Sequence, residues 1–191
     1  LVAMRAEIIL RSAPTTGSHP YLIRKQVPGL GVHFYDSEIL IPVRDMAGKT
    51  WGYERVLEDG AKLFLSGQRV EGCFHKINGD ERRVYIAEGY ATAASVHMAT
   101  DCAVFCAYHA GNLKEVCRQV AVHLPKAEVV IAGDDDQWTP GNPGRTKALA
   151  ALAAIGGRVV FPVFKDSSTK PTDFNDLHVL EGLDVVRKLL G

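Results

Sequence analysis

Short apolar runs that alternate with helix-like segments are the feature that most constrains the fold of this chain, and they begin near residue 83. Four such runs are too short for buried helices and have the composition of buried strands: Val84–Ala87, Ala103–Ala107, Val129–Ala132 and Arg158–Phe161. Strands that alternate with helices form a mostly parallel sheet with helices on both faces. The sequence therefore predicts an α/β fold over residues 83–191, with short helices closing the C-terminus.

Two asparagines mark expected helix starts within this region. Asn112 precedes a segment with apolar residues at helical spacing, and Glu115 stands at the capping-box position. Asn142 precedes Pro143, a residue favoured in the first helical position, and Gly156 follows the last residue of the expected helix. We expect both asparagine side chains to cap their helices.

The first 82 residues have a different pattern. Residues 1–35 are expected to form an irregular lead with one short helix. Residues 36–82 contain strand-like runs separated by glycine-containing turns: Ile39–Val43, Trp51–Val56 and Leu63–Leu65. A small β-rich subdomain of antiparallel strands is therefore expected before the α/β domain of residues 83–191.

Composition sets further limits. Lys plus Arg equals Asp plus Glu, 22 each, which is mild evidence against a strongly basic nucleic-acid-binding module. No apolar run approaches the roughly 18 residues of a membrane span, so no membrane partner is expected. The four cysteines lack zinc-ligand spacing, and a reducing cytoplasm is the natural setting. We expect buried thiols at Cys102 and Cys106, which lie in an apolar strand-like run. The chain opens on Leu1 rather than on Met, which suggests a fragment of a longer protein.

Acidic residues follow two of the predicted strands. Glu88 comes directly after the first strand, and Asp134, Asp135 and Asp136 come one glycine after the third. The carboxyl ends of parallel strands are where open α/β sheets place their sites. Residues two apart in an extended segment point the same way, so Asp134 and Asp136 can face one site while Asp135 faces elsewhere. Either group taken alone is more typical of a turn or a solvated loop.

Carboxylates placed this closely need a compensating charge. Two of them about 4 Å apart repel by roughly 4 kcal/mol at an effective dielectric constant of about 20. A divalent cation relieves that repulsion, and hard oxygen ligands select Mg²⁺ or Mn²⁺. Asp173 and Asp176 form a third acidic group after the fourth strand. The pattern indicates metal-assisted phosphoryl or nucleotidyl transfer.

Three segments in this order resemble the motifs of Toprim (topoisomerase–primase) domains. Ile86–Ala93 resembles the glutamate motif, Val130–Asp136 the DxD motif, and Asp173–Leu177 the acidic motif that follows in bacterial-type primases. Ala110–Leu113 and Gly141–Gly144 resemble the variants found in primases and primase-helicases of plasmids, phages and integrative elements. The resemblance implies a Toprim-type α/β fold.

An upstream segment favours a DNA primase among Toprim proteins. Ile41–Asp45, Gly48, Gly52–Arg55 and Lys62–Leu65 resemble the region that precedes the Toprim domain in bacterial-type primases. The chain has no Cys/His zinc-binding module and no Walker motif, so a replicative helicase, or a fused helicase domain, is expected outside this fragment.

The resemblance implies a role for each matching carboxylate. Asp134 and Asp136 would bind the divalent cation, Mg²⁺ or Mn²⁺. Glu88 would be a metal ligand or the general acid/base at the 3′-hydroxyl, and these alternatives stay open. Asp173 and Asp176 would support a second metal or order the site.

The resemblance also implies contacts to nucleotide and template. Arg44, Arg55 and Lys62 would contact the incoming triphosphate or the template backbone, although a solvated face of a β-ribbon is an alternative. Asn112 would mark a helix start that aims backbone N–H groups at a phosphate, although a structural cap is equally consistent. The implied reaction is synthesis of short RNA primers on single-stranded DNA from nucleoside triphosphates.

Two other functions use the same features. A Toprim nuclease would use the metal site to hydrolyse a phosphodiester. A replication module that binds DNA or a helicase would have lost catalysis, but such a module has no reason to keep mutually repelling carboxylates. A topoisomerase is disfavoured, because strand passage needs a tyrosine nucleophile on a further domain.

Overall fold

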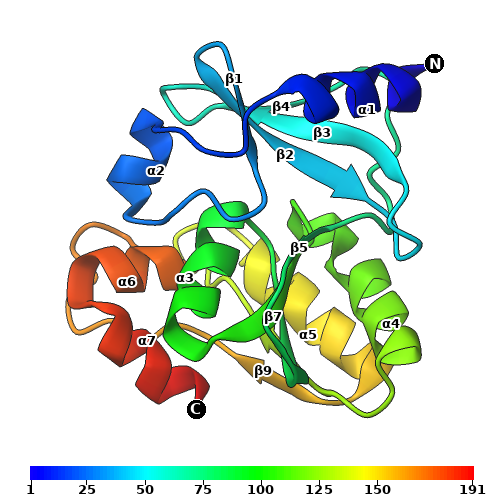
Figure 1. The fold of residues 1–191 in the computed structure, drawn as a ribbon. Coiled ribbons are helices and arrows are strands. Elements are labelled where there is room, and N and C mark those ends of the chain that lie inside the picture. Colours follow the sequence, from blue (N-terminus) through cyan, green and yellow to red (C-terminus); the bar gives the residue numbers. More distant parts are fainter. The chain divides into compact units, whose positions relative to one another are not determined.

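The structure, a computed structural model, describes residues 1–191 without a gap. The chain forms two compact units, Leu1–His75 and Lys76–Gly191 (Figure 1). The division into residues 1–35, 36–82 and 83–191 stays a prediction. None of the helices has both the length and the apolar composition that crossing a bilayer requires.

The first unit is built on an antiparallel sheet in the order β1-β2-β3-β4. Its elements are α1 (Val2–Ser12), α2 (Pro20–Lys25), β1 (His33–Tyr35), β2 (Glu38–Arg44), β3 (Thr50–Val56) and β4 (Lys62–Phe64). Ala6 and Leu10, one helical turn apart on α1, pack against Leu40 and Tyr53 of the sheet. This packing gives the unit its own apolar core, and the predicted small β-rich subdomain is confirmed.

The second unit is built on a five-stranded sheet in the order β5-β7-β6-β8-β9. Its strands are β5 (His75–Ile77), which begins at the last residue of the first unit, β6 (Asp80–Ala87), β7 (Cys102–Cys106), β8 (Glu128–Ala132) and β9 (Arg158–Val160). β6 is the middle strand and pairs in parallel with both β7 and β8, and β8 pairs in parallel with β9. Val84 to Ala87 are fully buried, because layers of helices cover both faces of this strand.

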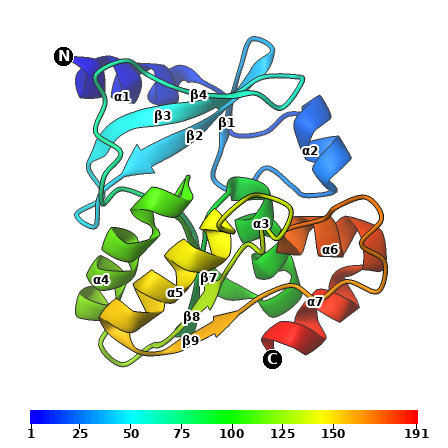
Figure 2. The same ribbon diagram turned by 180° about the vertical axis from the view of Figure 1, so that it is seen from behind.

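Helices cover this sheet on both faces, as predicted (Figures 1 and 2). The helices are α3 (Tyr90–Thr100), the short 3₁₀ turn η1 (Ala110–Asn112), α4 (Leu113–His123), α5 (Pro143–Ile155), α6 (Phe174–Glu181) and α7 (Leu183–Leu190). α3, α6 and α7 pack together on one face, and α4 packs with α5 on the other. The α/β fold expected from the alternation of strands and helices is therefore confirmed.

The two asparagines at helix starts behave differently. Asn142 caps α5 as predicted, and its side-chain oxygen accepts the Arg145 N–H at 3.2 Å. Asn112 is the N-cap residue of α4, but the predicted capping bond from its side chain is absent. Its backbone is already helical, with φ −93° and ψ −12°, and its side chain makes no capping hydrogen bond. A capping side chain reaches the first turn from a non-helical backbone, as at Asn142, where φ is 41° and ψ is 70°. The Asn112 amide instead donates to the Ala107 carbonyl at 3.0 Å, just beyond β7.

Candidate active site

The carboxyl ends of β6 and β8 bring Glu88 and Asp134 to the same edge of the sheet. The two strands are parallel neighbours and pair Ala87 with Ala132. Glu88 follows Ala87 directly, and Asp134 lies one glycine beyond Ala132. Both acidic side chains are half-buried. The two carboxylates therefore leave adjacent strands at the same level, which is where an open α/β sheet places its site.

The aspartates after Asp134 are oriented by the start of α5. Asp135 accepts a hydrogen bond from the Asn142 amide at 2.6 Å and lies 3.3 Å from the Arg145 guanidinium. Asp136 Oδ2 accepts the backbone N–H of Gly144 at 2.9 Å. The N-terminus of a helix attracts negative charge, so the start of α5 stabilises this acidic loop. Asp135 is engaged by two side chains of that helix, while Asp136 is held through one oxygen by the backbone.

Gly144 permits the close approach between the loop and the helix. An ideal Cβ at Gly144 would lie 2.7 Å from Asp136 Oδ2 and 2.9 Å from the Asp134 carbonyl oxygen. Both distances are shorter than Cβ atoms adopt, and one of the obstructing atoms belongs to the backbone. A larger residue would therefore displace Asp134 and Asp136 from the helix start.

The third acidic group forms the start of α6. Asp173 is the N-cap and accepts the Asp176 N–H at 2.8 Å. Asp176 in turn accepts the Thr172 N–H through Oδ2 at 3.0 Å. These reciprocal bonds resemble a capping box and fix the direction in which both carboxylates point.

Two hydrogen bonds connect this helix start to the loop that follows β8. The Asp135 N–H donates to the Thr172 carbonyl at 2.8 Å, and the Trp138 indole donates to the Pro171 carbonyl at 3.3 Å. The chain segment before α6 therefore lies beside the DxD loop. The loop of Asp134 and Asp136 thus lies beside the end of β6, which leads into Glu88, and beside the segment that leads into Asp173 and Asp176. The catalytic and metal-binding roles of these carboxylates remain predictions.

The expected phosphate-binding residues of the first unit do not converge. Arg55 pairs with Glu38 through two hydrogen bonds, one of them 2.6 Å long, and this pairing raises the pKa of Arg55 and lowers that of Glu38. Arg55 lies opposite Leu63 in the β3–β4 ladder, whereas Lys62 lies opposite Val56. Successive residues of a strand face opposite sides, so Arg55 and Lys62 lie on opposite faces of the sheet.

The third of these residues, Arg44, is half-buried at the end of β2. Its Nε lies 3.4 Å from the Thr50 hydroxyl, across the β2–β3 hairpin. A role for Arg44, Arg55 or Lys62 at a phosphate stays a prediction, as does one for the backbone amides after Asn112.

Glu54 is a buried carboxyl that the sequence did not single out. It is 2% exposed in β3, and its Oε2 atom accepts no hydrogen bond. Burial raises its pKa to about 7, although the charge of Lys62 opposes that shift. The signal available in the sequence was position alone, because Glu54 alternates with Tyr53 and Arg55 and must face the other side of the strand.

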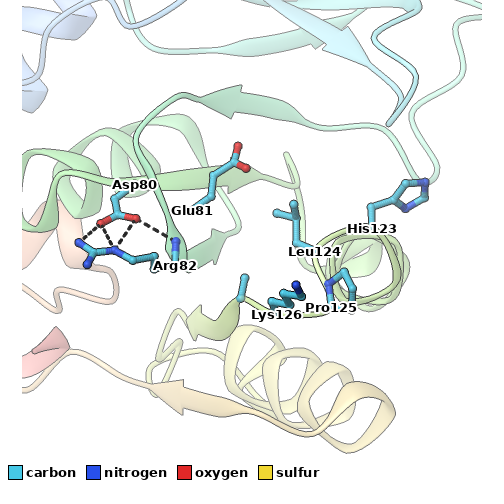
Figure 3. A pocket seen from close by; sticks show the side chains of 8 residues that line it. Asp80, Glu81, Arg82, His123, Leu124, Pro125 and Lys126 are labelled. Carbon is cyan, nitrogen blue, oxygen red and sulfur yellow. Dashed lines mark hydrogen bonds and ion pairs between the residues drawn. The ribbon is translucent and has the colours of Figure 1, made fainter.

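A groove of about 580 Å³ lies away from these carboxylates, at the amino ends of β6 and β8 (Figure 3). Asp80, Glu81 and Arg82 line it on one side and residues 123–127 on the other. Arg82 pairs with Asp80, and Lys76 pairs with Glu81 at 2.5 Å. The groove contains none of the expected site residues, and its acidic side chains form ion pairs with Arg82 and Lys76.

A parallel sheet with acidic groups beyond the carboxyl ends of two adjacent strands defines an α/β protein with a candidate metal site at one edge. Residues 83–184, which make up more than half of the chain, match the Toprim domain. The chain therefore belongs to the Toprim domain family.

Two curated relatives are both called DNA primase TraC and come from Escherichia coli. One is 43% identical over 166 residues, and the match covers 79% of this chain and 15% of that protein. The other is 38% identical over 181 residues, and the match covers 88% of this chain and 12% of that protein. The chain thus spans less than a sixth of the length of the curated relatives it matches.

Solved structures share the fold. The primase fragment of the bacteriophage T7 primase-helicase protein has a TM-score of 0.67 at 14% identity, covering 95% of this chain and 77% of that one. The DnaG primase catalytic domain bound to single-stranded DNA has a TM-score of 0.51 at 16% identity, covering 95% and 61%. At these identities the likeness shows the fold alone.

The donor set at the carboxyl edge fits a hard divalent cation. All candidate ligands are carboxylates, and carboxylate oxygens are what Mg²⁺ and Mn²⁺ prefer. No three Asp, Glu, His or Cys side chains converge closely enough to bind an ion by themselves. Mg²⁺ commonly binds one or two protein carboxylates and completes its shell with water and substrate phosphates. Asp134 and Asp136 leave one short loop, so they would supply the two carboxylates of such a site.

Proposed function

We propose that this chain is the catalytic core of a DNA primase, which joins ribonucleotides into short primers on a single-stranded DNA template. The observation that carries the proposal is the common edge occupied by Glu88 and Asp134, beyond the paired residues Ala87 and Ala132. The hydrogen bond from the Asp135 N–H to the Thr172 carbonyl brings the segment that precedes Asp173 and Asp176 beside that edge. The names of the TraC relatives support the same activity.

The reaction forms one phosphodiester bond for each nucleotide added. The 3′-hydroxyl of the growing primer loses its proton and attacks the α-phosphorus of the incoming triphosphate, and pyrophosphate leaves. A Mg²⁺ or Mn²⁺ ion would be held by Asp134 and Asp136, with Asp173 and Asp176 supporting a second ion, and would supply charge neutralisation at the phosphates. Glu88 would act either as a further ligand or as the base that takes the hydroxyl proton.

The partners follow from this reaction. The substrates would be nucleoside triphosphates and a single-stranded DNA template. The much greater length of the relatives leaves room for a helicase, or a domain that recruits one, outside residues 1–191. Access to a DNA template would place the protein in the cytoplasm.

Primer synthesis tests the proposal directly. The chain is incubated with circular single-stranded DNA, labelled ribonucleotides and Mn²⁺, beside the Asp134→Asn/Asp136→Asn double variant, and the products are separated on a denaturing gel. Asp184→Asn serves as the matched control, because Asp184 is an exposed acid on α7 that pairs only with Arg187 of its own helix.

Short labelled RNAs from wild type and control, but not from the double variant, are the expected result. DNA cleavage without labelled RNA would instead establish a Toprim nuclease. The absence of any product from the wild type would contradict a polymerase that is active within residues 1–191.

A further inference from the structure

Three buried polar side chains link α3 to α6, and we call them the Ser95 triad. Ser95 lies in α3, and Asn175 and His178 lie in α6; they are 0%, 0% and 7% exposed. The Asn175 amide nitrogen donates to Ser95 Oγ at 2.9 Å. Ser95 Oγ lies 3.0 Å from His178 Nδ1. One hydroxyl therefore joins two side chains of the neighbouring helix.

The chemistry of the three groups fixes the direction of these bonds. The Asn175 nitrogen can only donate, so Ser95 Oγ accepts from it. The Ser95 hydroxyl proton is then available to His178 Nδ1, which accepts when the ring is neutral with its proton on Nε2. The hydroxyl is thus used both as donor and as acceptor.

A network of this kind specifies one relative position of two helices. Apolar side chains can slide against one another at little cost, whereas a buried polar group that loses its partner is strongly penalised. Displacing α6 along α3 would break both bonds to Ser95 at once. The Ser95 triad therefore fixes the register of α6 on α3 more sharply than packing alone.

The triad lies between the acidic motifs. α3 begins at Tyr90, two residues after Glu88, and carries Ser95 in its second turn. Asn175 stands between Asp173 and Asp176 in the first turn of α6. A rigid path thus runs from Glu88 along α3, across the triad, to the carboxylates at the start of α6.

We propose that Ser95, Asn175 and His178 are positioning residues that hold the acidic start of α6 in register with Glu88 for divalent-cation binding. The inference rests on the proposed function, because it assigns Asp173 and Asp176 to the metal site of that reaction. The three residues act through the carboxylates and not on the substrate. Groups that orient metal ligands commonly change metal affinity by about 10- to 100-fold when they are removed.

Mn²⁺ binding to the chain, measured by the electron paramagnetic resonance signal of free Mn²⁺ without nucleotide or DNA, tests this inference. Ser95→Ala removes the hydroxyl that both bonds share, and it is expected to raise the dissociation constant for Mn²⁺ by about tenfold or more. Thr100→Val is the matched control on α3, because the Thr100 hydroxyl donates to the Val96 carbonyl at 2.8 Å and accepts the Cys102 N–H at 3.3 Å, and neither bond reaches α6. This control is expected to leave Mn²⁺ affinity unchanged.

A second pair of variants separates positioning from a loss of packing. His178→Asn can place an amide oxygen near the site of Nδ1 and accept the Ser95 hydroxyl, whereas His178→Leu cannot. We expect Mn²⁺ affinity to be retained in His178→Asn and lost in His178→Leu, with folding of each variant verified by urea denaturation.

If both Ser95→Ala and His178→Leu bound Mn²⁺ as tightly as the wild type, the inference would be overturned. In that case, primer synthesis by the wild type would still support the proposed function. If the wild type itself bound Mn²⁺ but made no primers, the proposed function would fail while the positioning role of the triad was still decided by the same variants.

Discussion

Replacing the buried carboxyl of Glu54 by an amide should remove a pH dependence from the stability of the first unit. Burial holds the pKa of Glu54 at about 7, against 4.5 for an exposed glutamate. Glu54 therefore stays protonated in the folded chain over a range of pH in which it is ionised in the unfolded chain. Stability from this group is fully present below pH 4.5 and is lost as the pH rises through 7.

The magnitude follows from the shift in pKa. Each pKa unit corresponds to about 1.4 kcal/mol, so this shift corresponds to roughly 3 kcal/mol between pH 4.5 and pH 8. The buried His75 acts in the opposite sense. Burial lowers its pKa from 6.5 to about 4, so the stability associated with it is lost as the pH falls from 6.5 towards 4. Both proteins contain His75, and its contribution cancels in the difference between wild type and Glu54→Gln.

Urea denaturation at several pH values measures this difference. A Trp138→Phe background leaves Trp51 as the single tryptophan, so that fluorescence reports on the unit that contains Glu54. The free energy of unfolding of Glu54→Gln relative to its Glu54 parent should increase by about 3 kcal/mol from pH 4.5 to pH 8. A constant difference across that range would refute the reasoning, because it would mean that Glu54 titrates alike in the folded and unfolded chains.

Three further substitutions, at Gly144 and Asp173, test the acidic loop and the helix start beside it. Gly144→Ala should lower the free energy of unfolding by about 1–3 kcal/mol and reduce primer synthesis, because the new Cβ would meet Asp136 Oδ2 at 2.7 Å. An unchanged midpoint of urea denaturation would contradict this, because it would show that the acidic loop accommodates the Cβ without loss of stability. Asp173→Ala should lower the free energy of unfolding by about 1 kcal/mol, because it removes the N-cap of α6. Asp173→Asn should keep the cap and weaken Mn²⁺ binding. Equal Mn²⁺ affinity in Asp173→Asn and wild type would show that Asp173 is not a metal ligand.

The features that the sequence predicted well are those encoded by neighbouring residues. Runs such as Val84–Ala87 and Val129–Ala132 combine a strand-like composition with a following acidic group, and parallel pairing puts their ends at one edge. The cap at Asn142 was likewise predictable, because Pro143 sets the first helical residue. Each of these inferences needed only a short window of sequence.

Features that depend on the exact backbone conformation of a turn, or on contacts across the fold, were not predictable. The cap at Asn112 failed because a 3₁₀ turn sets its backbone before the helix begins. The pair between Arg55 and Glu38 joins two strands whose register no local pattern reveals. Ser95 and Asn175 lie 80 residues apart, and only the packing of α6 on α3 brings them together.

The rate of the first phosphodiester bond tests the central claim most directly. It is measured as dinucleotide formed from two ribonucleoside triphosphates on a single-stranded template, for wild type, Asp134→Asn and the Asp184→Asn control. If Asp134 lies in the active site, Asp134→Asn lowers this rate by at least about a hundredfold, which corresponds to roughly 3 kcal/mol of transition-state stabilisation. The Asp184→Asn control is expected to match the wild type. A rate for Asp134→Asn equal to that of the wild type, in a folded protein, would contradict the assignment of the active site.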